Sequence, residues 1–265
     1  MPSQLPFMTA TLAIVAGLFG LAIGSFLNVC IDRLPKGESI AGGRSHCDTC
    51  GRQIRARDLI PVLSYVVLRG RCRDCGARIP RRVVLVESAT GLAFAGLVLA
   101  YGLTAVTVVL AVYAAILIVV FVIDAEHRLI LNQVVLASLI FSLIVAAAVQ
   151  PPWLGDFGPH PFASAVAGAA AGFALLFVVA LIARGGMGWG DVKFAAFMGA
   201  ATGLPLVFVA LFCAIILGGV TGIVLIVSRK RSRKQAIPFG PFLTLGTMAT
   251  LLWGPQMLSW YLGLM

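Results

Sequence analysis

Two aspartates draw attention because each lies at the end of a long apolar segment. Asp124 closes the run AILIVVFVID, and Asp191 follows the glycine-rich string GMGWG and opens another such segment. Ionisable groups at membrane depth are costly and are usually functional. Two carboxylates that share a proton can act together, one as a base toward water and the other as an acid toward a carbonyl group. The pair therefore suggests hydrolysis, with ordinary helix-end residues, such as a cap at Asp191, as the alternative.

Four cysteines form two pairs with the spacing of a metal site. Cys47 and Cys50 make the first pair, Cys72 and Cys75 make the second, and a glycine follows each pair. Such glycines permit the positive φ that turns backbone amides toward the sulfurs. Two pairs of this kind fit a tetrahedral zinc site with four thiolates, and disulfides are the alternative. A four-thiolate site is closed, so the expected role of the zinc is structural: it supplies folding energy to a loop with little core.

The elements that must position these residues are apolar segments long enough to cross a membrane. Of the 265 residues, 60% are hydrophobic and only 11% are charged, whereas about a quarter of a soluble domain is charged. A spanning helix needs about 20 apolar residues. We therefore expect an all-α polytopic membrane protein with about eight transmembrane helices and turns near Gly102 and Gly203. The expected spans lie near residues 8–30, 83–101, 104–123, 132–149, 161–183, 191–203, 206–227 and 239–263.

The basic residues gather on one side of this arrangement. Twelve of the twenty Lys and Arg residues lie between Arg33 and Arg82, and five more lie between Arg229 and Lys234. The positive-inside rule assigns these segments to the cytoplasm and both termini to the outer side. Contact with anionic membrane lipid explains the charge, and no basic module interleaved with aromatic residues indicates nucleic-acid binding. The first apolar segment has no cleavage signal, so we expect a retained helix.

Several strings occur in a recognisable order along nearly the whole chain. GMGWGDVKFAAFMGA occupies residues 186–200, and the stretch 123–132 runs from Ile-Asp to Asn. Further strings are GSFLNVCIDRLP (24–35), the paired cysteine motifs, IPVLSYVVLRGRC (60–72) and IPFGPFLTLG (237–246). Together they resemble the bacterial type IV prepilin peptidases, which are membrane aspartic proteases of the glycine-x-glycine-aspartate type. The resemblance implies cleavage of the basic leader of pilin-like precursors beside their apolar helix, and N-methylation of the new terminus with S-adenosylmethionine.

The resemblance also implies roles, domains and a location. Asp124 and Asp191 match the family's protease dyad, and the four cysteines match its cysteine tetrad. The expected division is a first transmembrane helix (1–31), a cytoplasmic zinc-binding loop domain with the methyltransferase part (32–82), and a transmembrane aspartic peptidase domain (83–265). The implied partners are prepilin-like substrates and membrane lipid, in the bacterial inner membrane.

Three polar residues are candidates for binding the methyl donor. Asn28, Arg33 and Glu87 lie near the cytoplasmic ends of the first two expected spans. They could contact the carboxylate, ribose or amine of S-adenosylmethionine, and interfacial anchoring or helix packing explains them equally well. The chain has Val83 and Val84 where the family commonly has Tyr-Pro, so a peptidase without methyl transfer stays an alternative. It also has Leu131 where the family commonly has Pro.

Two further alternatives come from other functional classes. A proton-coupled transporter could use the two aspartates as relays, because glycine-interrupted spans occur in transporters. Flux without peptide cleavage would favour it. A non-enzymatic assembly protein could use the zinc loop for docking, and it predicts that replacing Asp124 or Asp191 by Asn leaves cellular function intact.

Overall fold

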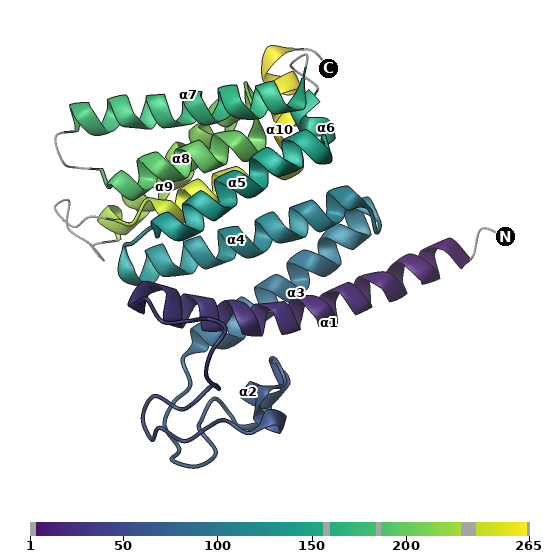
Figure 1. Ribbon diagram of the computed structural model, residues 1–265, viewed down its shortest axis with the longest axis vertical. Helices are drawn as coiled ribbons and strands as arrows, with labels where there is room; N and C mark the ends of the chain where they lie inside the picture. Colours follow the sequence, from purple (N-terminus) through teal and green to yellow (C-terminus); the bar gives the residue numbers. More distant parts are fainter. Residues whose placement is uncertain (1–3, 156–159, 184–186, 229–236, 264–265) are drawn as a thin grey trace. The chain divides into compact units, whose positions relative to one another are not determined.

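The computed structural model describes residues 4–155, 160–183, 187–228 and 237–263, and within these the secondary structure is helical with no β-strand (Figure 1). The basic run between Arg229 and Lys234 lies outside the described residues. The helices are α1 (Gln4–Arg33), η1 (Leu34–Lys36), η2 (Ala56–Leu59), α2 (Leu63–Val67), α3 (Arg81–Tyr101), α4 (Ala105–His127), α5 (Asn132–Ala148), α6 (Pro152–Gly155), α7 (Pro161–Ile182), α8 (Trp189–Thr202), α9 (Leu206–Val227) and α10 (Gly240–Leu262).

Among the described residues, five segments are long and apolar enough to cross a membrane, so the chain is a membrane protein. They are Met8–Lys36 and the helices α3, α4, α7 and α9. Helices α5, α8 and α10 coincide with the other three predicted spans. At 1.5 Å per residue, the 14 residues of α8 extend only about 21 Å, less than the hydrocarbon core. Eight crossings therefore remain a prediction.

Two predicted turns occur where the sequence placed them. Gly102 ends α3 with φ 67°, and Gly203 ends α8 with φ 76°. Both values lie in the left-handed region that favours glycine. The short helices α2 and α6 were not predicted, because neither is long enough to carry a periodic pattern.

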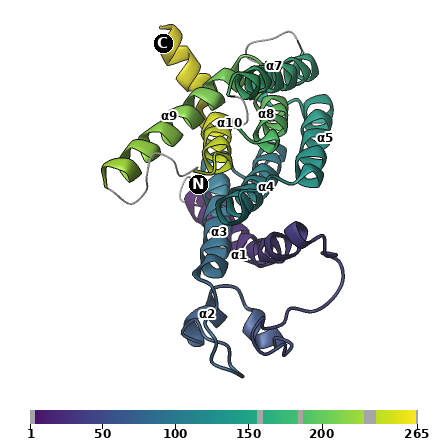
Figure 2. The same cartoon turned by 90° about the vertical axis from the view of Figure 1, so that its left-hand side faces the viewer.

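The chain forms two compact units, residues 1–119 and 120–265, with the division inside α4. In the first unit α1 packs against α3 (Figure 2). Glycines allow this approach, since a Cβ added at Gly24 would lie 2.7 Å from the Cα of Glu87. The segment 37–80, which we call the cysteine loop, connects the two helices. The three-domain division 1–31, 32–82 and 83–265 stays a prediction.

The second unit is built around α8. Helices α5, α7, α9 and α10 all contact α8, and most of its residues beyond Lys193 are fully buried. Gly168 of α7 and Gly199 of α8 bring the two backbones together, because a Cβ on either would collide with the other's carbonyl group. A helix surrounded by other helices can be shorter than one that spans the bilayer alone. The first turn of α8 lies against the residues that follow α4.

Candidate functional site

Asp124 lies in the last turn of α4 and is only 5% exposed. Its Oδ2 accepts a hydrogen bond from the backbone N–H of Gly240, the first residue of α10, at 2.9 Å. A Cβ at Gly240 would lie 2.6 Å from the same oxygen, so this approach requires glycine. The unpaired N–H groups and partial positive charge of a helix start also favour a carboxylate there.

Asp191 lies in the first turn of α8 and is partly exposed. Its N–H donates to the carbonyl of Gly188 at 3.1 Å, and a Cβ at Gly188 would lie 3.3 Å from Asp191 Oδ2. A charge on Asp124 would act on Asp191, so the two carboxyl groups lie within electrostatic reach of one another. The second unit thus brings together the two aspartates that the sequence singled out.

The α4–α5 connection packs on the start of α8. Ile130 is 9% exposed, and a Cβ at Gly190 would lie 2.8 Å from its Cβ. Next to this contact, Lys193 Nζ donates to Asn132 Oδ1 at 2.9 Å. Leu131 has φ −76°, a value that proline also adopts. The replacement of the family's proline by leucine is therefore compatible with the backbone at this position.

Gly240 is the member of this site that sequence reasoning missed. It lies 116 residues from Asp124, within the string IPFGPFLTLG, to which no role was assigned. The available signal was a glycine between Phe239 and Pro241 immediately before an apolar run, a pattern that places a small residue at a helix start.

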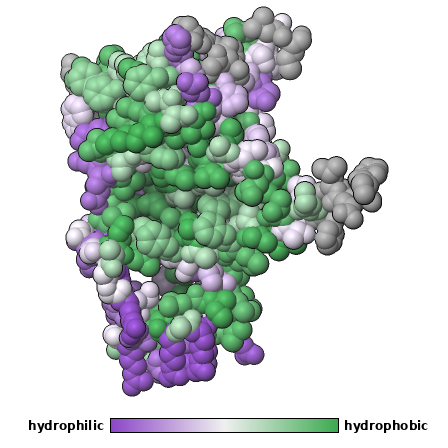
Figure 3. Space-filling model, turned by 45° about the vertical axis from the view of Figure 1, so that its right-hand side comes forward, coloured by the Kyte–Doolittle hydropathy of each residue, from purple (hydrophilic) through white to green (hydrophobic). Residues whose placement is uncertain are grey.

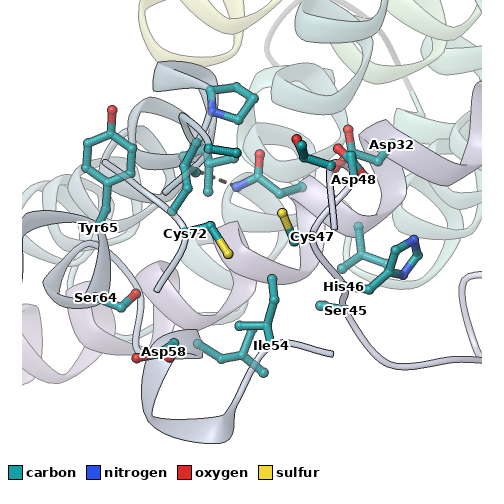
Figure 4. A pocket seen from close by; sticks show the side chains of 18 of the residues that line it. Asp32, Ser45, His46, Cys47, Asp48, Ile54, Asp58, Ser64, Tyr65 and Cys72 are labelled. Carbon is teal, nitrogen blue, oxygen red and sulfur yellow. Dashed lines mark hydrogen bonds between the residues drawn. The ribbon is translucent and has the colours of Figure 1, made fainter. Parts of the chain in front are cut away.

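The four predicted cysteines form a compact cluster in the first unit. Their sulfurs all lie within 4.8 Å of one another, and Cys47 Sγ is 3.8 Å from Cys75 Sγ. Figure 4 shows the side chains of Cys47 and Cys72 near one another. Sulfurs bound at about 2.3 Å to one tetrahedral zinc ion lie ~3.8 Å apart, whereas a disulfide needs ~2.05 Å. The cluster therefore fits a four-coordinate metal, and the cysteines are unpaired.

Two backbone turns of the same form build this cluster. In the first, Cys47 N–H donates to Arg52 O at 2.9 Å and Gly51 N–H donates to Cys47 O at 2.8 Å. Cys72 and Gly76 repeat both bonds, and Gly51 and Gly76 have φ 67° and 72°. The backbone amides of Cys50 and Thr49 lower the pKa of Cys47 to about 6. A thiolate is the form that binds a metal.

A cavity of about 380 Å³ lies against the cysteine cluster, within the size range of small-molecule sites. Asn28, Arg33 and Glu87 all line it, so the three candidates for the methyl donor share one cavity. Asn28 Nδ2 donates to Val83 O at 3.0 Å, and Arg82 pairs with Asp32 at 2.5 Å. The first contact uses the backbone carbonyl of Val83, so it does not depend on the side chain at that position.

Like Asn28, the other two candidates for binding the methyl donor, Arg33 and Glu87, already make hydrogen bonds within the protein. Arg33 donates to the carbonyls of Ser39 and Gly42 and so orders the start of the cysteine loop. Glu87 is 5% exposed, and its Oε2 accepts from Val62 N–H at 2.7 Å. Val62 has φ 61°, a region that β-branched residues rarely adopt. The carboxylate of Glu87 therefore holds an unfavourable turn in place.

Two acids of the loop are occupied by its own arginines. Arg73 pairs with Asp58 at 2.6 Å, and this guanidinium holds the pKa of Asp58 below its usual value. Asp74 pairs with Arg52 and Arg55 at 3.5 and 3.4 Å. These ion pairs connect the segments on either side of the two cysteine pairs.

Comparison with known proteins matches both units. The model of the bacterial peptidase A24 N-terminal domain matches residues 18–101, and that of the type IV leader peptidase family matches residues 111–223. The prepilin leader peptidase/N-methyltransferase of Bacillus subtilis is 32% identical over 92% of this chain and 96% of its own length. That of Pseudomonas putida is 34% identical over 91% of both chains. A type 4 prepilin-like proteins leader peptide-processing enzyme of Escherichia coli is 36% identical over 91% of this chain and 94% of its own. No solved structure matches.

Proposed function

We propose, because the chain belongs to the prepilin leader peptidase/N-methyltransferase family, that it cleaves the leader of prepilin-like proteins and methylates the new N-terminal residue. The observation that carries the peptidase half is the pair of interacting carboxylates, Asp124 and Asp191, at one end of the second unit. The methyltransferase half is supported by the cavity that Asn28, Arg33 and Glu87 share.

In the proposed peptidase step the two aspartates divide the work of an acid and a base. One carboxylate takes a proton from water as the water oxygen attacks the scissile carbonyl carbon, and the other, protonated, donates to the carbonyl oxygen. Collapse of the tetrahedral intermediate breaks the C–N bond, and the proton taken from water passes to the leaving amine. The backbone N–H of Gly240 holds one oxygen of Asp124, so this carboxyl group would keep its position during the reaction.

The membrane arrangement is part of the proposal. Eight crossings with the cysteine loop in the cytoplasm and both termini outside place Asp124 and Asp191 at the cytoplasmic face of the bacterial inner membrane. A prepilin whose apolar helix lies in the same bilayer would present its cleavage site at that depth. The basic loop segments would contact anionic lipid, and no nucleic-acid partner is proposed.

The residues of the first unit suit two bound groups. Cys47, Cys50, Cys72 and Cys75 would hold a structural zinc ion, as their sulfur spacing allows. S-adenosylmethionine, when bound, supplies an electrophilic methyl group. In the cavity, Asn28 and Arg33 offer donors and Glu87 offers a buried carboxylate able to orient an amine. Residues 32–82 would form the main part of the methyltransferase, with Asn28 and Glu87 supplied by the flanking helices, and residues 83–265 would carry the transmembrane peptidase.

One experiment tests both halves. Purified enzyme is mixed with a prepilin, with and without S-adenosylmethionine, and the products are weighed by mass spectrometry. We expect a free leader in both reactions, and a mature chain heavier by one methyl group only with the donor. Cleavage without the mass gain would leave a peptidase alone, and an intact precursor in both reactions would reject the proposal.

A further inference from the structure

The cysteine loop exposes a group of large apolar side chains that its own fold does not cover. They lie in η2, in α2 and in the segment between the two helices, and their exposed fractions run from 43% to 65%. We call them the α2 patch: Leu59, Ile60, Leu63, Val66 and Val67. Figure 3 shows apolar surface directly beside strongly hydrophilic surface on this loop. Surface of this kind marks an interaction site.

Helix α2 presents different residues to its two sides. Ser64, Tyr65 and Leu68 line the cavity, and Tyr65 packs over Gly70, where a Cβ would lie 2.9 Å from the tyrosine Oη. Leu63, Val66 and Val67 are all more than half exposed. The inward residues fix α2 on the loop, so its apolar face is held outward.

The depth of α2 along a membrane-spanning helix identifies what covers this face. Val62, the residue immediately before α2, donates its backbone N–H to Glu87. Glu87 lies six residues into α3, which begins at Arg81, and therefore about 9 Å along the helix axis. Interfacial helices bury their apolar face ~5–10 Å into the boundary between headgroups and acyl chains. Helix α3 is long and apolar enough to span the bilayer. With Arg81 at the membrane surface, the start of α2 would lie level with that boundary.

The charges around the patch favour an anionic surface. Arg57 precedes the patch and Arg69 follows it, and both side chains are exposed. Basic residues beside an apolar face are typical of segments that rest on anionic lipid. A soluble protein partner would not require the patch to lie at the level of the first turns of α3.

We propose that the α2 patch docks into the interface of an anionic bilayer, the same membrane that α1 and α3 span. The cysteine loop would then lie on the membrane surface, and α2 would contact the lipid with one face and line the cavity with the other. The proposal is independent of the peptidase and methyltransferase activities, because it rests only on exposure, charge and the bond between Val62 and Glu87.

Tryptophan fluorescence in vesicles tests this placement. Val66→Trp and Val67→Trp each place a reporter on the patch, and Ile40→Trp places one on an exposed apolar residue of the same loop. The full-length enzyme is reconstituted without substrate into phosphatidylcholine–phosphatidylglycerol vesicles with acyl chains brominated near the headgroup. The emission of the wild-type chain, which has four tryptophans, is subtracted.

We expect the added emission of both patch reporters to be blue-shifted and reduced by about half or more by the brominated lipid. The Ile40→Trp emission should stay at the wavelength of water-exposed indole and be unquenched. Vesicles of phosphatidylcholine alone should quench the patch reporters less. Patch reporters that behave like Ile40→Trp overturn the proposal. A blue shift and quenching that appear only when a prepilin is added also overturn it. Equal quenching in both vesicle types would overturn the requirement for anionic lipid.

Discussion

The backbone N–H of Gly240 donates a 2.9 Å hydrogen bond to Oδ2 of Asp124, although 116 residues separate the two in the chain. This bond joins the end of α4 to the start of α10. It fixes one oxygen of a buried carboxylate by a backbone group, which side-chain motion cannot remove. The position of Asp124 relative to Asp191 therefore depends on α10 as well as on the helices that carry the aspartates.

Replacing Gly240 by Ala should reduce leader cleavage strongly. The added Cβ would lie 2.6 Å from Oδ2 and 2.8 Å from the carboxyl carbon of Asp124, so that side chain must move. A displacement of about 1 Å at a reacting group costs roughly 100-fold in rate. Steady-state kinetics should place the loss in kcat with little change in KM. Gly219→Ala is the matched control, because a Cβ there meets nothing within 4 Å, and an equal loss in both variants would argue against a specific effect.

The hydrogen bond between Lys193 and Asn132 should act as a clamp on the start of α8. Asn132→Leu removes the acceptor and should lower kcat about fivefold, equivalent to about 1 kcal/mol. Asn132→Asp keeps an acceptor oxygen and should restore the rate. In a double-mutant cycle, Lys193→Met should add little to Asn132→Leu. Additive losses would show that the two side chains act separately.

Loss of zinc should unfold the cysteine loop and spare the peptidase. Cys72→Ser removes one of four thiolates, so bound zinc and resistance of residues 37–80 to protease should both fall. Methyl transfer should disappear with the cavity, whereas leader cleavage should persist, because both aspartates and Gly240 belong to residues 120–265. Cys213→Ser, in α9, is the control. Unchanged zinc content in Cys72→Ser would contradict the four-thiolate site.

Glu87→Gln should separate the charge of Glu87 from its structural bond. The glutamine carbonyl can still accept from Val62 N–H, so the loop should keep its protease resistance and its zinc. Methyl transfer should nevertheless fall at least about tenfold if the carboxylate orients the amine, a loss of about 1.4 kcal/mol. The mass of the mature product, followed over time, gives this rate. Methyl transfer at the wild-type rate by Glu87→Gln would show that Glu87 only accepts the hydrogen bond from Val62 and does not orient the donor.

The sequence predicts the helices well because charge-free segments mark them directly. Turns at Gly102 and Gly203 follow from the need to break long apolar runs. The two cysteine pairs follow from local spacing. The shared location of Asn28, Arg33 and Glu87 was expected only in so far as all three lie near the same ends of the first two spans.

Other features depend on contacts that no local pattern encodes. Helix α8 is apolar and buried on all sides, so nothing in its sequence tells which neighbours surround it. The bond from Gly240 to Asp124 needs α10 to begin at one particular place beside α4. Val62 adopts a φ that its residue type disfavours, because Glu87 stabilises it from another helix. Tertiary packing decides all three.

The central claim is that Asp124 and Asp191 form one catalytic pair, and the rate of leader release by single variants tests it most directly. Asp124→Asn and Asp191→Asn should each lower the rate roughly 10²–10⁴-fold, while Asp48→Asn, an exposed loop carboxylate, should leave it unchanged. Because the two carboxylates act as a unit, the double variant should be no slower than the slower single variant. Leader release at the wild-type rate by either single variant would contradict the pair.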